Sequence, residues 1–139
     1  MSYVIIGDNI VVDSKEILKY IKKEFDFKEV KDITKAANRE DTLVYQILQD
    51  TKTMKEDIDL ENIGESLTEE ELAEEFMAVA DENVLLIEDI IPEGFICHGY
   101  SYHYDEGLDE IKSIFLAVDE AVGEKKLMDI INRILNSVD

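Results

Sequence analysis

One span of the chain is strongly acidic and contains no basic residue. Residues 56–111 hold 19 aspartates and glutamates but no lysine or arginine. Residues 1–55 are balanced, with ten acidic and ten basic side chains, so the formal net charge of −20 arises in the later part of the chain. Carboxylates in residues 56–111 therefore have no basic partner within their own segment, and they repel one another over about 8 Å at physiological salt.

Three interpretations of this acidic span are open. Its carboxylates form a solvated surface, form a docking face for a cationic partner, or bind divalent metal. A surface of this sign repels phosphate, which argues against binding of nucleic acids or anionic lipids. Asp57, Asp59 and Glu61 imitate the start of a calcium loop, but Asn62 and Thr68 then stand where an EF-hand needs glycine and glutamate. We therefore expect no metal site.

The length and composition suit one globular domain. The chain has 139 residues, 45% of them hydrophobic, which is enough to build a core, and we expect residues 1–139 to form a single domain. Its one cysteine, Cys97, has no internal disulfide partner and fits a reducing compartment. The sequence shows no signal peptide, and no apolar run approaches the roughly 20 residues of a membrane span. We therefore expect a cytoplasmic protein without membrane insertion.

The first half of the chain predicts a hairpin followed by helices. Two β-branched runs, 3–6 and 10–12, flank Gly-Asp-Asn, which favours a tight β-turn. An apolar stripe over 14–25 is typical of a helix. Apolar residues over 40–51 indicate a second helix, although the β-branched residues there leave a strand open. The polar segment 52–66 predicts a loop.

The second half predicts a helix, a hairpin and two further helices. A Thr-x-x-Glu capping box at Thr68 begins the first of these helices. The apolar run 84–87 is typical of an interior strand, and turn residues join it to a returning strand over 95–104. Apolar residues at helical spacing predict two final helices, over 108–118 and 127–138. The whole pattern predicts an α+β domain in which a small antiparallel sheet, formed by two hairpins, is covered by four or five helices.

The strand that begins at residue 95 holds the densest group of polar and aromatic side chains. Residues 95–105 contain both histidines, the only cysteine and three of the six tyrosines. Tyrosines bury a large area and keep a hydroxyl for hydrogen bonding, which suits interfaces and ligand clefts. Alternation along a strand predicts that one face carries Ile96, His98, Tyr100, Tyr102 and Tyr104. We predict a partner-binding surface made of His98, Tyr100, Tyr102, Tyr104, Glu69, Glu70 and Glu74.

Familiar catalytic and cofactor motifs are absent from the sequence. Cys97 and His98 would point to opposite faces of a strand, and His103 would lie about 20 Å further along at roughly 3.3 Å per residue. This geometry argues against a thiol–imidazole pair and against a zinc site made of the same three residues. The six glycines form no phosphate-binding loop, and there is no G-x-S-x-G motif. We name no catalytic residue, no metal and no cofactor.

The sequence leaves three functions open. The first is a non-enzymatic protein-binding or accessory module whose acidic, tyrosine-bearing face meets a basic protein surface. The second is an enzyme or small-molecule binder with a pocket around His98, Tyr100 and Tyr102. The third is a homo-oligomer formed through the apolar stripe of the last helix and the sheet edges. The charge favours the first, so we expect a protein partner with a basic surface.

Overall fold

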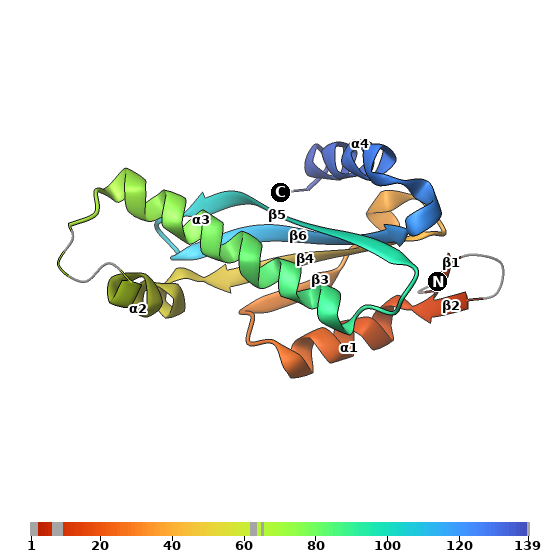
Figure 1. Cartoon of the computed structure of the whole chain (residues 1–139), viewed down its shortest axis with the longest axis horizontal. Helices are drawn as coiled ribbons and strands as arrows, with labels where there is room; N and C mark the ends of the chain where they lie inside the picture. Colours follow the sequence, from red (N-terminus) through yellow and green to blue (C-terminus); the bar gives the residue numbers. More distant parts are fainter. Residues whose placement is uncertain (1–2, 7–9, 62–63, 65, 139) are drawn as a thin grey trace.

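A four-stranded antiparallel sheet organises the molecule. The computed structural model describes residues 3–6, 10–61, 64 and 66–138, and within them the chain forms four α-helices, this sheet and a separate two-stranded hairpin (Figure 1). The architecture is therefore α+β. In chain order the elements are β1 Tyr3–Ile6, β2 Ile10–Asp13, α1 Ser14–Glu24, β3 Glu29–Asp32, the 3₁₀ helix η1 Thr34–Ala37, β4 Thr42–Asp50, α2 Thr51–Glu61, α3 Glu69–Leu85, η2 Leu86–Ile90, β5 Phe95–Asp105, β6 Glu110–Asp119, η3 Glu120–Val122 and α4 Glu124–Leu135.

The strand order in the sheet is β3-β4-β6-β5, and every neighbouring pair is antiparallel. β4 and β6 lie in the middle and pair along their whole length, from Thr42 opposite Val118 to Asp50 opposite Glu110. Most of their side chains are buried, because helices cover both faces of the sheet. β3 and β5 form the two edges.

Two faces of the sheet carry different helices. On one side, which we name the α3 face, α1 and α3 pack against β4 and β6 around Tyr45 and Phe115, and the β1–β2 hairpin joins the same core through Val4 and Val12. On the other side, the α4 face, α4 packs against alternate residues of the same strands, including Leu116. Figure 1 shows α3 running across the sheet, whereas α4 lies over one end of it.

Both central strands were predicted as helices, and that prediction is wrong. Residues 42–50 form β4 where the sequence favoured a helix over 40–51, with a strand as the alternative. Residues 110–119 form β6 where it favoured a helix over 108–118. A strand that is buried on both faces has apolar residues in every position, so its spacing also satisfies a helical pattern. The second hairpin therefore consists of β5 and β6. The prediction that two hairpins form the sheet is also wrong, because β1 and β2 pair only with each other and the four-stranded sheet is completed by β3 and β4.

Two further segments differ from the prediction. The run 84–87, expected as a strand, ends α3 and begins η2. Within it Val84 and Ile87 are fully buried, while the two leucines between them are about half exposed. The segment 52–66, expected as a loop, is largely α2. Over residues 51–60, where the burial of α2 is described, only Thr51, Met54 and Ile58 are buried, so its apolar stripe is too narrow to stand out in the sequence.

The other predicted elements are confirmed. They include a capping box in which the Thr68 hydroxyl accepts a hydrogen bond from the Glu71 backbone N–H at 3.1 Å. The turn predicted over residues 7–9 lies outside the described residues. Among the described residues, none of the helices has the length and apolar character that crossing a membrane requires. The confirmed elements are the strands 3–6 and 10–13, the helix 14–24, the helix that follows Thr68, the strand 95–105 and the helix 124–135.

Candidate binding surfaces

A β-bulge interrupts β5 after Ser101. Ser101 pairs with Ser113, and His103 pairs with Lys112, so two steps along β5 correspond to one step along β6. A bulge of this kind reverses the alternation of the residues that follow it. The prediction of five side chains on one face therefore holds only up to the bulge.

Tyr104 lies on the α3 face, apart from the rest of the predicted stripe. Its ring meets Phe76 of α3 edge-on, with the ring centroids 5.6 Å apart. Burial, followed by the charges of Glu106 and Asp109, raises the pKa of the Tyr104 hydroxyl. The prediction that Tyr104 shares a face with the earlier tyrosines is wrong, because strict alternation takes no account of the bulge.

His98, Tyr100 and Tyr102 lie on the α4 face. His98 and Tyr100 pair with residues of β6 whose side chains face α4. Tyr100 is 43% exposed, whereas Tyr102 packs against the α4 cluster and its hydroxyl accepts a hydrogen bond from Gln46 Nε2 at 2.7 Å. The bulge adds the exposed His103 to this side of β5, a placement that the alternation pattern missed.

Glu69, Glu70 and Glu74 are exposed on α3. Since α3 covers the opposite face of the sheet from His98 and Tyr100, the predicted acidic, tyrosine-bearing surface is divided into two separate surfaces. α2 packs beside α3 through Met54, Ile58, Phe76 and Ala80 and extends the acidic surface. We name this surface the acidic layer, and its exposed carboxylates are Glu56, Asp57, Asp59, Glu69, Glu70, Glu71, Glu74 and Glu82.

Two features that suggested an oligomer are satisfied in part within the chain. Most of the apolar stripe of α4, including Leu127 and Ile131, is buried against its own sheet, whereas Met128 is 45% exposed. At the β5 edge, the Ser101 backbone N–H donates to Asp81 Oδ1 of α3 at 2.7 Å. A side chain that takes up an edge N–H in this way protects the strand from pairing with another chain.

A broad groove lies on the α4 face, next to the chain that follows α4. Its volume is about 560 Å³, within the roughly 300–1,000 Å³ of typical ligand pockets. The lining combines two lysines, three carboxylates and a small apolar area; its residues are Glu29, Lys31, Gln46, Leu48, Asp105, Leu108, Glu110, Lys112, Ser137 and Val138. None of His98, Tyr100 and Tyr102 lines it, although Gln46 connects the groove to the Tyr102 hydroxyl.

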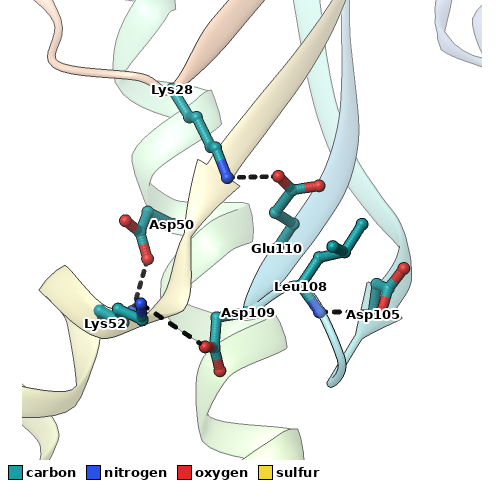
Figure 2. A network of polar contacts seen from close by, with 7 residues as sticks. All are labelled: Lys28, Asp50, Lys52, Asp105, Leu108, Asp109 and Glu110. Carbon is teal, nitrogen blue, oxygen red and sulfur yellow. Dashed lines mark hydrogen bonds and ion pairs between the residues drawn. The ribbon is translucent and has the colours of Figure 1, made fainter.

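A network of ion pairs lies where β4 ends and β6 begins. Figure 2 shows Lys28 hydrogen-bonded to Glu110, and Lys52 Nζ 3.9 Å from Asp109 Oδ2. The Lys52 backbone N–H donates to Asp50 Oδ1 at 2.8 Å, which satisfies a donor at the start of α2. The hydrogen bond to Glu110 raises the pKa of Lys28. Both lysines therefore meet carboxylates at the β5–β6 hairpin end, Lys28 through a hydrogen bond and Lys52 at the outer limit of an ion pair.

Cys97 has the environment of a structural thiol. It packs against the core cluster on the α3 face, and burial, followed by the charge of Glu88, raises its pKa to about 12. A thiol with this pKa is protonated at neutral pH and is a poor nucleophile. Among the described residues, no group of three or more His, Cys, Asp or Glu side chains is placed to hold a metal ion.

Comparisons of the chain with models of protein families, with curated proteins and with solved structures found no match. The function of this protein is therefore to be inferred from its own residues and their placement.

Proposed function

We propose that the protein is a non-enzymatic binding module that docks a basic protein surface through its acidic layer. The observation that carries this proposal is the charge of α3. Its 17 residues include seven acidic side chains and no lysine or arginine. Five of these carboxylates are exposed, at Glu69, Glu70, Glu71, Glu74 and Glu82.

Helix stability accounts for only part of this charge. The acids of the first turn, Glu69 to Glu71, favour the positive end of the helix dipole. Glu74 lies four residues after Glu70, a spacing at which like charges repel, and Glu82 stands in the last turn, where a basic residue would be favourable. A solvated helix is served equally well by interspersed charges of both signs. The uniform sign therefore supports a partner of opposite charge.

A basic surface is the partner that this layer would recognise. Complementary potentials accelerate encounter and orient the two proteins, and this effect weakens as salt screens the charges. The predicted residues Glu69, Glu70 and Glu74 belong to the proposed surface. His98, Tyr100 and Tyr102 lie on the other face of the sheet and are not part of it.

Affinity capture with the tagged chain tests this proposal. We expect a basic protein to be captured from the producing cells at about 0.05 M NaCl and released at about 0.5 M, because the Debye length falls with salt. The triple variant Glu69→Gln, Glu70→Gln, Glu74→Gln should lose this protein. A matched variant, Glu120→Gln, Glu124→Gln, Asp129→Asn, changes the net charge equally on exposed residues of η3 and α4 and should retain it.

The paired variants make the result decisive. Equal losses in both variants would show that net charge alone attracts the protein, and capture that is indifferent to salt would contradict an electrostatic docking face. If the α3 variant still captures the basic protein while the η3–α4 variant loses it, Glu69, Glu70 and Glu74 are not part of the interface.

A second candidate function is small-molecule binding in the groove on the α4 face. It is favoured by the volume of about 560 Å³ and by a lining that offers cations and anions around Leu48. A thermal-shift screen of small zwitterionic and anionic compounds should then find a stabilising ligand, and Lys112→Ala should abolish its effect. If no compound raises the melting temperature, or if Lys112→Ala leaves the shift unchanged, the groove is not the ligand site.

A further inference from the structure

A second cavity opens within the helical side of the molecule, beside the acidic layer. It lies where the segment after α1, the start of α2 and the end of α3 meet, and its volume is about 210 Å³. This is smaller than the roughly 300 Å³ at the lower end of typical ligand pockets, so a single side chain suits it better than a whole cofactor. The residues that line it include Phe25, Asp26, Phe27, Gln49, Asp50, Asn83 and Leu86.

We propose that this cavity is an anchor site for one arginine side chain of the basic partner. The inference rests on the proposed function and adds to it the chemical group that the partner inserts. It is supported by an aromatic wall, by carboxylates at the rim and by a rigid polar floor.

The aromatic wall consists of two phenylalanines. Phe25 and Phe27 stack with their ring centroids 5.5 Å apart and an interplanar angle of 15°. Both side chains are half-buried and pack against the main core, so their positions are fixed before a partner arrives. A planar guanidinium binds favourably to an aromatic face, and it is less strongly hydrated than an ammonium group.

The charge around the cavity favours a cation. Asp26 and Asp50 line it. Lys28 lies within reach of the charge of Asp50 but donates its hydrogen bond to Glu110, and Lys52 Nζ lies 3.9 Å from Asp109 Oδ2 (Figure 2). α3 ends at the cavity, and its last turn contains no basic residue. The negative end of that helix dipole adds to the attraction for a positive group.

The polar side chains at the base of the cavity already have hydrogen-bond partners. Gln49 Nε2 donates to the Ala80 carbonyl at 3.0 Å and lies 3.2 Å from Ser113 Oγ, while Asn83 Nδ2 donates to Gln49 Oε1 at 3.2 Å. These hydrogen bonds hold the amide groups of Gln49 and Asn83 in place. An incoming positive group would therefore pair with the carboxylates of Asp26 and Asp50. Leu86 is 53% exposed at the rim and would cover the aliphatic part of an arginine side chain.

Nuclear magnetic resonance titration of the full chain tests the anchor site. The probe is N-acetyl-arginine amide, and the control probe is N-acetyl-citrulline amide, which has the same shape without the charge. We expect the arginine probe to shift the amide signals of Asp26, Asn83 and Leu86, and the citrulline probe to leave them in place. Equal shifts with both probes would overturn the proposal.

Two pairs of variants locate the site. Asp26→Asn should lower the affinity for the arginine probe about fivefold, the loss expected for one screened carboxylate contact. Asp57→Asn on α2 should leave this affinity unchanged. Leu86→Lys places a cation at the rim and should block the probe. Leu85→Lys adds the same charge at the neighbouring exposed position, which does not line the cavity, and should leave binding intact. If both lysine variants weaken the probe equally, the cavity is not the site.

A second probe separates this inference from the proposed function. A decapeptide of lysine and glycine carries positive charge without a guanidinium group, and the acidic layer should bind it in a salt-dependent way. If this peptide binds along α3 while the arginine probe leaves the cavity signals unchanged, the anchor site is wrong and the docking face stands. If the arginine probe fills the cavity but the peptide does not bind at low salt, the docking face is wrong.

Discussion

At the scale of single residues, Gly99 lets α3 lie directly on β5. A Cβ atom at this position would stand 2.9 Å from Val84 Cγ1 and 3.4 Å from the Leu85 backbone nitrogen. We expect Gly99→Ala to destabilise the fold by about 1–3 kcal/mol through overpacking, measured by urea denaturation. Gly107→Ala is the control, since its Cβ would meet only Asp105 Oδ1 at 3.4 Å. Equal stabilities of the two variants would contradict this close packing.

Cys97 gives a prediction about pH. Its pKa is raised from 9.0 to about 12, so the folded state favours the neutral thiol. This contribution to stability is complete below pH 9 and is lost as the pH rises toward 12. At pH 9, we expect iodoacetamide to alkylate the folded chain on the order of a hundredfold more slowly than the urea-unfolded chain. Equal rates would show that the thiol is ionised and accessible in the folded protein.

Part of the candidate surface could be predicted residue by residue. Alternation correctly places His98, Tyr100 and Tyr102 on one face, because these residues precede or form the bulge. Tyr104 is misplaced because the bulge lies between Ser101 and His103, and although Gly99 is compatible with a bulge nearby, it does not fix the position of one. The bulge is accompanied by the bond from Ser101 to Asp81 of α3, 20 residues away, and a local pattern contains no information about such a contact.

At the scale of elements, local signals predicted the helix that follows Thr68 and failed for the central strands. A capping box is complete within four residues, so its geometry can be read from the sequence. β4 and β6 are strands that pair with each other and each with an edge strand, between two helical layers, and the pairing of β4 with β6 joins segments far apart in the sequence. Their nearly continuous apolar sequence indicates burial on both faces, but such a sequence fits a buried helix as well as a buried strand.

The contact between α3 and the β5 edge gives a prediction at this scale. Asp81→Ala leaves the Ser101 N–H without its carboxylate acceptor, and we expect a loss of about 1–3 kcal/mol in urea denaturation. Glu82→Ala is the matched control, since it removes the neighbouring exposed carboxylate from the same helix. If both variants lose the same stability, helix propensity and charge explain the effect, and the edge contact contributes nothing.

At the scale of the whole molecule, the net charge of −20 opposes folding by self-repulsion. We expect the melting temperature to rise between about 0.05 M and about 0.5 M NaCl, since the Debye length then falls to a few ångströms. The rise should be smaller for the variant Glu69→Gln, Glu70→Gln, Glu74→Gln, which has lost three charges from α3. A melting temperature that falls with salt would show that attractive pairs such as Lys28–Glu110 outweigh the repulsion.

Stability and binding should respond in opposite directions to one substitution in the acidic layer. Glu74→Lys replaces a repulsive pair with Glu70 by a favourable one, and we expect it to stabilise the fold by about 0.5 kcal/mol. The same change reverses a charge on the proposed docking face, so the affinity for the captured basic protein should fall about tenfold. Both effects are measured on one preparation, by thermal unfolding and by titration calorimetry.

Glu120→Lys on η3 changes the net charge by the same amount and is the control for binding, since it lies outside the acidic layer. If Glu74→Lys stabilises the protein and binds the partner as well as the control does, then the carboxylates of α3 only keep the surface hydrated. If Glu74→Lys stabilises the fold and weakens binding, while Glu120→Lys leaves binding unchanged, the repulsive carboxylates of α3 contribute to binding a positive surface. If the charge of α3 binds no partner, Glu74→Lys should lower neither the thermal stability nor the affinity measured by calorimetry.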